Sequence, residues 1–344
     1  MMKKAPLASL AALGVLALAL SGCGTTDVAA QDTAAPESAT SAECSADDTA
    51  TSTDPVTLTD DFGRTVELDK PAERVAVLEW QQIEDALTLC VTPVAVADAE
   101  GYSTWDTAEV LPEGVTDVGT RQEPNLEALF ATNPDLVIVE ASGADDEIIA
   151  QLEAYDVPVL ATIGADAADP IAKMLATFDL IAQATGREER ADVVKDEFDA
   201  YLADAKGELA DADLATTDFI FFDGWVDGGN VAIRPFGQGS LIGEIGEELG
   251  LTNAWTGEVD PAYGLGQTDI EGMVAVGEAN LLHTGTVDDT EDDFVSALDS
   301  NSVWESLPAV EEERVYSFPA GIWTFGGPRS AQQIIDAYVS ALSK

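Results

Sequence analysis

From residue 74 onward, short apolar runs typical of strands alternate with segments of helical spacing. In the first half the strand-like runs are RVAVLEW (74–80), TPVAVAD (92–98), DLVIVEA (135–141) and VPVLATI (157–163). Helical spacing follows in QQIEDALTL (81–89), NLEALFATN (125–133) and DDEIIAQLEAY (145–155). Short strands and helices in alternation indicate a parallel sheet with helices on its faces. The pattern therefore predicts an α/β fold.

The second half repeats this alternation after a helical stretch. Its strand-like runs are DFIFFDGW (218–225), ANLLHTG (279–285) and RVYSF (314–318), and residues 240–250, 268–276 and 330–342 have helical spacing. Between the halves, Asp169 suits an N-cap, Pro170 the first turn and Gly186 the end of a helix. A second helix is expected at about residues 188–209. We predict two parallel-sheet lobes joined by a long backbone helix.

These patterns divide the chain into five segments. They are a lipoprotein signal peptide (1–22), a lipidated disordered tether (23–54), an N-terminal α/β lobe (55–168), a connecting helix (169–186) and a C-terminal α/β lobe (187–344). The tether is expected to be disordered because it has almost no large apolar side chain to bury.

The first residues have the features of an export signal. Lys3 and Lys4 precede the apolar run APLASLAALGVLALAL, which is short for a membrane span. The run ends in LSGC, which resembles a bacterial lipobox and implies cleavage before Cys23 and acylation of that cysteine. We therefore expect a lipid-anchored protein on the extracytoplasmic face of the cell membrane. The alternative is an ordinary secretory signal with a chance cysteine.

The charge of the chain excludes some partners. With 65 acidic and 15 basic residues, the formal net charge is −50. Nucleic acid needs basic patches, so it is not expected as a partner. The acidity instead indicates a strongly hydrated surface that stays soluble at high salt. In an oxidising compartment Cys44 and Cys90 could pair or remain two thiols, and the sequence leaves both open.

In open parallel sheets, ligands bind beyond the carboxyl ends of the strands. Two such sheets facing each other would form a cleft lined by the residues that follow the strands. The residues expected there are mainly aromatic: Glu79, Trp80, Tyr102, Trp105, Arg121, Ser142, Trp225, Arg234, Phe236, Tyr263, Trp323 and Phe325. An apolar wall with a few arginines suits such a ligand site. The alternative is that these rings pack loops onto the core.

Several motifs, in order, resemble the iron–siderophore substrate-binding proteins of ABC importers, in particular the ferric hydroxamate type. They include VTLTDDFGRTVEL (56–68), VADAEGYSTW (96–105), VGTRQEPNLE (118–127), GLTNAWTGE (250–258) and GIWTFGGPRSA (321–331). The resemblance covers about residues 55–343. It implies two α/β lobes bridged by a long helix, with a ferric siderophore in a groove between them.

The resemblance also implies roles for single residues. Arg121 matches an arginine that holds hydroxamate oxygens around the iron, and Trp105, Trp323 and Phe325 fall at ligand-lining positions. Tyr263 stands where the family has a tryptophan. The family's tyrosine after the third strand is missing, since residues 142–146 read SGADD. This departure leaves the particular siderophore open.

Two glutamates are expected to have a different role by the same resemblance. Glu127 and Glu271 match the glutamates, one on each lobe, that dock onto the membrane permease in this family. The alternative for each is an ordinary acidic residue in the first turn of a helix. Arg234 and Arg329 are further ligand candidates, and the alternative for Arg329 is a surface ion pair.

The chemistry of the residues fits a binding protein without a cofactor. The iron of a ferric siderophore already has its oxygen shell filled, so no metal ligand from the protein is needed. The single histidine, His283, argues against a zinc or manganese site and is interpreted as structural. No nucleophile elbow or phosphate loop is found, so no enzyme activity is expected.

The expected partners are a ferric siderophore and the permease and ATPase subunits of an ABC importer, with the protein itself a monomer. Cobalamin, haem or another ferric siderophore class remain alternative ligands, and a surface receptor without an importer remains an alternative role.

Overall fold

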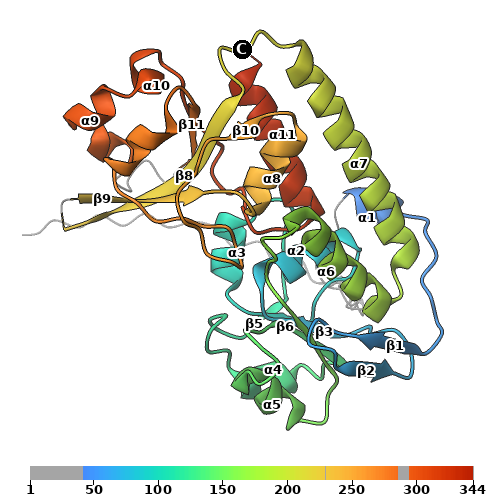
Figure 1. Cartoon of the computed structure of the whole chain (residues 1–344). Coiled ribbons are helices and arrows are strands. Elements are labelled where there is room, and N and C mark those ends of the chain that lie inside the picture. Colours follow the sequence, from blue (N-terminus) through green and yellow to red (C-terminus); the bar gives the residue numbers. More distant parts are fainter. Residues whose placement is uncertain (1–41, 229, 286–293, 344) are drawn as a thin grey trace, which may run out of the picture. The chain divides into compact units, whose positions relative to one another are not determined.

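The computed structural model describes residues 42–228, 230–285 and 294–343 (Figure 1). The expected signal peptide (1–22), the lipidation site at Cys23 and the tether up to residue 41 lie outside the described residues. Within the described ranges, no helix is both long enough and apolar enough to cross a lipid bilayer.

The N-terminal lobe is built on a five-stranded parallel sheet in the order β5-β4-β3-β6-β7. The strands are β3 (Val75–Val77), β4 (Ala95–Val96), β5 (Thr116–Asp117), β6 (Leu136–Glu140) and β7 (Val159–Thr162). All residues of β3 and β7 are buried, as is typical of strands covered on both faces. An antiparallel hairpin of β1 (Val56–Thr59) and β2 (Thr65–Leu68) precedes this sheet.

Four helices connect the strands of this lobe. They are α2 (Trp80–Thr88), α3 (Ala99–Trp105), α4 (Leu126–Ala131) and α5 (Glu147–Glu153). The sequence did not indicate α3, because its seven residues AEGYSTW bury only Tyr102 and show no apolar repeat. Asp98 starts it from a left-handed conformation, with φ of 57°, and its side chain accepts a hydrogen bond from the amide of Gly101.

The C-terminal lobe has a mixed sheet. Its parallel strands lie in the order β10-β8-β11-β12, and β9 pairs with β8 in antiparallel orientation. The strands are β8 (Asp218–Asp227), β9 (Asn230–Phe236), β10 (Thr252–Asn253), β11 (Asn280–His283) and β12 (Val315–Ser317). The predicted α/β class with parallel sheets is confirmed, and the antiparallel β9 is an addition that the sequence did not indicate.

The helices of this lobe are mostly short. They are α8 (Leu241–Glu248), α9 (Ser302–Glu305), α10 (Pro308–Glu311) and α11 (Pro328–Leu342), with 3-10 turns η1 (Gly272–Val276) and η2 (Ser296–Leu298). The α-helix expected at residues 268–276 is therefore only a 3-10 turn. Glycines bracket it, and Gly277 leaves it with φ of 60°.

Two antiparallel helices, not one, link the lobes. Helix α6 (Pro170–Thr185) begins at Asp169, which accepts from the amide of Ala172, and ends at Gly186 in the left-handed region. Its first half packs in the C-terminal core through Met174, and its second half packs in the N-terminal core through Phe178. The 24-residue helix α7 (Glu188–Asp211) then runs back from the N-terminal core to the C-terminal core.

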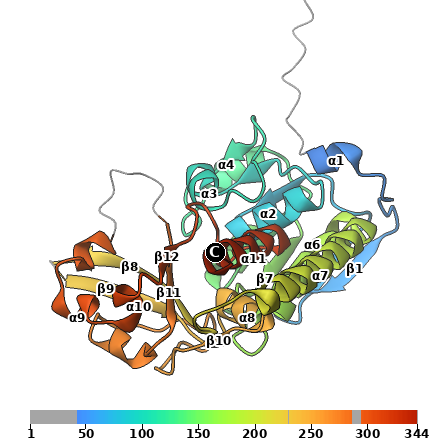
Figure 2. The ribbon, with the colours of Figure 1, turned by 90° about the horizontal axis from the view of Figure 1, so that it is seen from above.

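Figures 1 and 2 show α7 alongside both α6 and α11. Helix α6 has the bounds expected for the connecting helix, but α7 makes the final crossing. Because both helices are buried in both cores, they brace the two lobes against each other over several turns.

The start of α11 is held by a carboxylate from the other lobe. Glu84, on α2, accepts hydrogen bonds from the amides of Gly327 (2.8 Å), Arg329 (3.0 Å) and Ser330 (2.8 Å). The hydroxyl of Ser330 also donates to it, at 2.7 Å. These are the amides that a helix leaves without an internal partner, and Pro328 has none to donate. Glu84, on the first lobe, therefore acts as the N-terminal cap of a helix in the second lobe.

Residues 42–54, which we call the strap, are ordered against the lobes. The strap begins with α1 (Ala42–Ala46), and a disulfide joins Cys44 to Cys90 at the end of α2. Glu43 accepts from Arg190 on α7 at 3.0 Å and from Arg329 on α11 at 2.5 Å. The expectation of disorder up to residue 54 is therefore wrong for these residues. A covalent link and buried arginines replace the apolar side chains that the strap lacks.

Three buried acidic side chains cluster around the start of α11. Burial raises the pKa of Glu84, although hydrogen bonds from Ser330 and Gly327 oppose this rise. Burial and the charge of Glu84 raise the pKa of both Asp85 and Asp106 well above their ordinary range. The Oδ1 atom of Asp106 accepts from the amide of Ala108 at 3.2 Å, and its Oδ2 atom is buried without a hydrogen-bond partner among the described residues. Burial therefore favours the protonated forms of Asp85 and Asp106 beside the carboxylate that caps α11.

This cluster predicts how stability depends on pH. The folded state holds these protons at pH values where the unfolded chain has released them. The free energy of unfolding should therefore fall as pH rises above about 4–5, the ordinary range of carboxyl pKa values, by up to ~1.4 kcal/mol per pH unit for each such carboxyl. Urea unfolding across this range is the measurement. Asp85→Asn should flatten the slope, whereas the exposed-site variant Asp145→Asn should not. An unchanged slope in Asp85→Asn would contradict the assignment.

Candidate functional site

A cavity of about 240 Å³ lies between the two lobes. The N-terminal lobe contributes residues from the carboxyl edge of its sheet, where Glu79 follows β3 and Glu140 ends β6. Arg234 on β9 and the segment before α11 line the other side. The complete lining is Glu79, Gln81, Arg121, Glu140, Gly164, Arg234, Tyr263, Leu265, Trp323 and Phe325.

A short closed loop carries Arg121 into this cavity. Gly119 turns the chain with φ of 95° and pairs with Pro124 in an antiparallel bridge, which closes the loop. Asn125 then starts α4, and its side chain accepts a hydrogen bond from the amide of Ala128 at 3.0 Å. The loop GTRQEPN (119–125) therefore holds one arginine at the edge of the sheet.

The Arg121 guanidinium is held by a ring and a carboxylate. It lies 3.7 Å from the ring centroid of Trp80, and it forms an ion pair with Glu79. A cation over an indole ring gains about 0.5–2 kcal/mol. Its Nε atom has no hydrogen-bond partner among the described residues and lies 3.9 Å from Oδ2 of Asp98. The planar fork is thus fixed in place, while about a fifth of the side-chain surface (21%) stays exposed.

Aromatic rings form a wall beside Arg121, whose guanidinium lies 5.8 Å from the ring centroid of Trp323. The centroid of Trp323 lies 4.8 Å from that of Trp80 and 5.1 Å from that of Phe325, both with edge-on geometry. Phe325 in turn lies 5.4 Å from Tyr263. Rings at these separations stabilise one another, so the wall is rigid and apolar.

The second arginine of the cavity is already paired. Arg234 donates from Nε to Asp223 on the neighbouring strand at 2.9 Å, and a second contact joins its terminal nitrogen to the same carboxylate. Its guanidinium lies 5.5 Å from the ring of Phe236. Arg234 therefore adds shape and donors to the cavity but little uncompensated charge.

A hydrogen bond crosses the cavity between the lobes. The hydroxyl of Tyr263 donates to Oε1 of Glu140 at 2.9 Å. Burial, followed by the charge of Glu79, raises the pKa of Glu140 to about 7, although Tyr263, Arg121 and Lys173 oppose the rise. Gly164 makes room for this pair, because a Cβ there would lie 2.4 Å from the Tyr263 hydroxyl.

The structure brings together six of the cleft residues expected from the sequence, and seven lie elsewhere. The six that line the cavity are Glu79, Arg121, Arg234, Tyr263, Trp323 and Phe325. The seven that do not line it are Trp80, Tyr102, Trp105, Ser142, Trp225, Phe236 and Arg329.

Three of these seven side chains are buried and so cannot face the cavity. Trp80 is buried beneath Arg121, and Tyr102 and Phe236 belong to the two cores. The Tyr102 hydroxyl donates to the carbonyl of Glu109 instead of facing a ligand.

Four side chains lie outside the cavity. Trp105 is at the end of α3 and Trp225 is on the β8–β9 hairpin, with 37% and 46% of their surfaces exposed. Ser142 is exposed and donates to Asp146 at the start of α5. Arg329 is tied to Glu43 and Glu197, as its alternative interpretation expected.

The sequence motifs did not indicate four other lining residues, Gln81, Glu140, Gly164 and Leu265. A signal was present for Glu140, since it is the one carboxylate that ends the apolar run LVIVE. Gly164 and Leu265 carried no signal, because their role depends on what the opposite lobe places against them.

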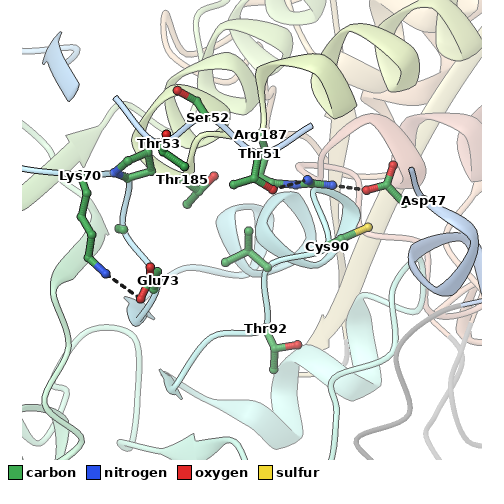
Figure 3. A pocket seen from close by; sticks show the side chains of 13 residues that line it. Asp47, Thr51, Ser52, Thr53, Lys70, Glu73, Cys90, Thr92, Thr185 and Arg187 are labelled. Atoms are coloured by element: carbon green, nitrogen blue, oxygen red, sulfur yellow. Dashed lines mark hydrogen bonds and ion pairs between the residues drawn. The ribbon is translucent and has the colours of Figure 1, made fainter. Parts of the chain in front are cut away.

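A larger cavity, of about 540 Å³, lies between the strap and the N-terminal lobe (Figure 3). Its charged side chains pair within the chain. Lys70 contacts Glu73 at 2.7 Å, and Arg187 donates to Thr51 at 2.8 Å and pairs with Asp47. We interpret this cavity as the seam where the strap lies on the lobe, because none of the interlobe site residues reaches it.

No group of three or more His, Cys, Asp or Glu side chains suited to a metal ion occurs in the described part of the chain. His283 is the last residue of β11 and is buried, with Nδ1 at 3.0 Å from the carbonyl of Thr284.

The chain has two lobes that are braced by helices, and a cavity lies between them at the carboxyl ends of the strands. This arrangement is the fold of a solute-binding protein. A model described as periplasmic binding protein matches residues 75–321, and the chain belongs to this family. The family expected from the sequence motifs is thereby confirmed.

Relatives with assigned ligands differ in what they bind. The iron(3+)-hydroxamate-binding protein FhuD of Escherichia coli (strain K12) is 26% identical over 270 residues, which cover 78% of this chain and 86% of FhuD. The Fe(3+)-citrate-binding protein YfmC of Bacillus subtilis (strain 168) is 27% identical over 274 residues, which cover 79% of this chain and 81% of YfmC.

A solved structure shows the same fold. The siderophore-binding protein FhuD from Vibrio cholerae, bound to Fe3+–Desferal, matches with a TM-score of 0.65 at 24% identity. The match covers 78% of this chain and 97% of that one.

The hydrogen bond between Tyr263 and Glu140 allows a direct test of the electrostatics of the cavity. Tyr263→Phe removes a donor that favours the ionised carboxylate, so the pKa of Glu140 should rise above about 7. Carbon-13 NMR of the Glu140 carboxyl group during a pH titration is the measurement. Tyr155→Phe, in the ring pair with Phe130 outside this cavity, is the matched control and should leave the titration unchanged. A fall or no change in Tyr263→Phe would show that the hydrogen bond does not form in solution.

Proposed function

We propose that this protein is an extracytoplasmic solute-binding lipoprotein that captures ferric siderophores, most of all ferric hydroxamates, in the interlobe cavity. It then delivers them to the permease of an ABC importer. The observation that carries the proposal is Arg121, which is stacked on Trp80, paired with Glu79 and lines the cavity beside an aromatic wall.

This arrangement matches the surface of a ferric siderophore. The chelator fills the oxygen shell of the iron, so its outer surface offers oxygens with partial negative charge and an apolar backbone. The guanidinium fork of Arg121 suits the oxygens, and the rings of Trp323 and Phe325 suit the backbone. The cavity of about 240 Å³ is smaller than the typical ~300–1,000 Å³ of ligand sites, so it would hold part of the ligand.

The charges of the cavity favour a hydroxamate over a strongly anionic complex. Both arginines are paired with carboxylates, Arg121 with Glu79 and Arg234 with Asp223. A ferric catecholate or citrate with several negative charges would have to compete with these carboxylates. The hydroxamate complex, in which ligand charge cancels that of iron(III), avoids this cost.

A binding role rather than catalysis is supported by the relatives, which are named as binding proteins. Haem, cobalamin and other ferric siderophores are the alternative ligands. For haem, Tyr102 would have been one axial ligand, but it is buried in the core, and Tyr263 is bonded to Glu140. The cavity therefore offers haem little that would replace a histidine ligand.

Replacement of Arg121 tests the ligand assignment. Arg121→Ala should weaken binding of ferrioxamine and ferrichrome by about 2–5 kcal/mol, because a charged hydrogen bond is lost from a partly buried site. Tryptophan-fluorescence titration of the full chain in detergent is the measurement, since Trp80 and Trp323 lie beside the ligand position.

Two further variants separate charge from geometry. Arg121→Lys keeps the charge but not the planar fork, so it should restore only part of the affinity. Lys206→Ala removes an exposed positive charge far from the cavity and should bind as the unaltered protein does. Unchanged affinity in Arg121→Ala would exclude Arg121 from the ligand site.

We also propose that Glu127 and Glu271 dock the protein on its permease and that Cys23 carries the lipid anchor. Glu127 is in the first turn of α4 and Glu271 precedes η1, one on each lobe, and both are exposed. Exposed carboxylates at matching places on two lobes suit arginines on a partner surface.

The docking proposal predicts a split between binding and uptake. Glu127→Ala with Glu271→Ala should abolish siderophore uptake by cells while the affinity of the purified protein stays unchanged. Glu147→Ala with Glu305→Ala is the control, because it removes equal charge from exposed first turns, one on each lobe. Equal uptake in both double variants would contradict docking through these residues, and lost affinity would place them in the ligand site.

A further inference from the structure

We propose that Glu140 is a specificity-determining residue that selects siderophore complexes carrying a positive charge, such as a ferric hydroxamate with a free ammonium group. This inference rests on the proposed function and goes further, since it assigns the ligand a charge. It follows from the place of Glu140 in the cavity and from the pairing of every charge around it.

Glu140 is placed to meet a ligand. It is the last residue of β6, next to β3 in the sheet, so its carboxyl group stands at the edge where the cavity opens. Tyr263 reaches it from the other lobe and donates to Oε1 at 2.9 Å. The absence of a side chain at Gly164 leaves space on that side, since a Cβ there would lie 2.5 Å from the Glu140 carboxyl carbon.

Glu140 is the carboxylate of the cavity that lacks a cation. Arg121 is paired with Glu79, and Arg234 is paired with Asp223. In the described part of the chain, Glu140 forms no ion pair.

The nearby Lys173 does not fill this role. Its ammonium group pairs with Asp61 instead. The cavity and its ion-pair partners thus carry surplus negative charge, because Arg121 is shared by Glu79 and Asp98, and Glu140 is the lining carboxylate without an ion pair.

A partly buried carboxylate with a neutral partner is unfavourable, and a ligand cation would relieve it. Charge-assisted hydrogen bonds between ammonium and carboxylate groups are about twice as strong as neutral ones. The iron core of a ferric hydroxamate is neutral, so groups at the ends of the chelator set the charge of the whole complex. An ammonium end group would complete the pairing, whereas a carboxylate end group would meet Glu140 and Glu79 together.

The same residue makes the preference depend on pH. Burial and Glu79 raise the pKa of Glu140 to about 7, while Tyr263, Arg121 and Lys173 hold it from rising further. Protonation removes the charge that selects the cation. The preference should therefore be largest above about pH 7 and decline as pH falls towards 6.

The test compares two ligands that share one iron core. Ferrioxamine B has a free ammonium group, and its N-acetyl derivative is neutral. Fluorescence titration of the full chain at pH 8 should show tighter binding of ferrioxamine B by about tenfold or more, the change that ~1.4 kcal/mol gives. In Glu140→Gln, which can still accept from Tyr263, the two ligands should bind equally because only ferrioxamine B loses affinity.

Controls and outcomes separate this inference from the proposed function. Glu147→Gln, at an exposed site on α5, should keep the preference. If both ligands bind the unaltered protein equally, or if Glu140→Gln keeps the preference, this inference is overturned while hydroxamate binding stands. If neither ligand binds and ferric citrate or a ferric catecholate does, the hydroxamate proposal fails as well.

Discussion

The capping of α11 by Glu84 is the interaction on which the site depends. It joins a helix of the first lobe to the last helix of the second, through three backbone amides and a hydroxyl. Burying a carboxylate is costly, and the dipole of a 15-residue helix with its free amides offsets part of that cost. Because the capped residues directly follow Trp323 and Phe325, the cap also sets the position of the aromatic wall.

The other contacts of the site build on the position of the aromatic wall. Trp323 packs edge-on against Trp80, and Trp80 supports the guanidinium of Arg121. Glu79 completes the clamp on Arg121 from the end of β3. The helices α6 and α7, buried in both cores, keep the two edges of the cavity at a fixed separation. A rigid, preorganised cavity loses little entropy on binding, which suits a protein that must capture a scarce ligand.

The sequence motifs indicated four residues that line the cavity in the structure, Arg121, Tyr263, Trp323 and Phe325. Tyr102 was wrongly expected in the cavity because it comes shortly after a predicted strand. In the structure, α3 turns its ring into the core, and α3 has no apolar repeat to reveal it. Glu140 was missed because a carboxylate at the end of a strand is ordinary until Tyr263 of the other lobe is seen to bond to it.

The sequence by itself determined the α/β class, the two lobes, the bounds of α6 and the loop that presents Arg121. These features arise from periodicity, caps and turns, which act over a few residues. Only the tertiary structure decided that Cys44 pairs with Cys90, that Glu84 caps α11 and that Glu140 bonds to Tyr263 across the cavity. Each of these depends on the distance between side chains that are far apart in the sequence. A local sequence pattern does not predict such distances.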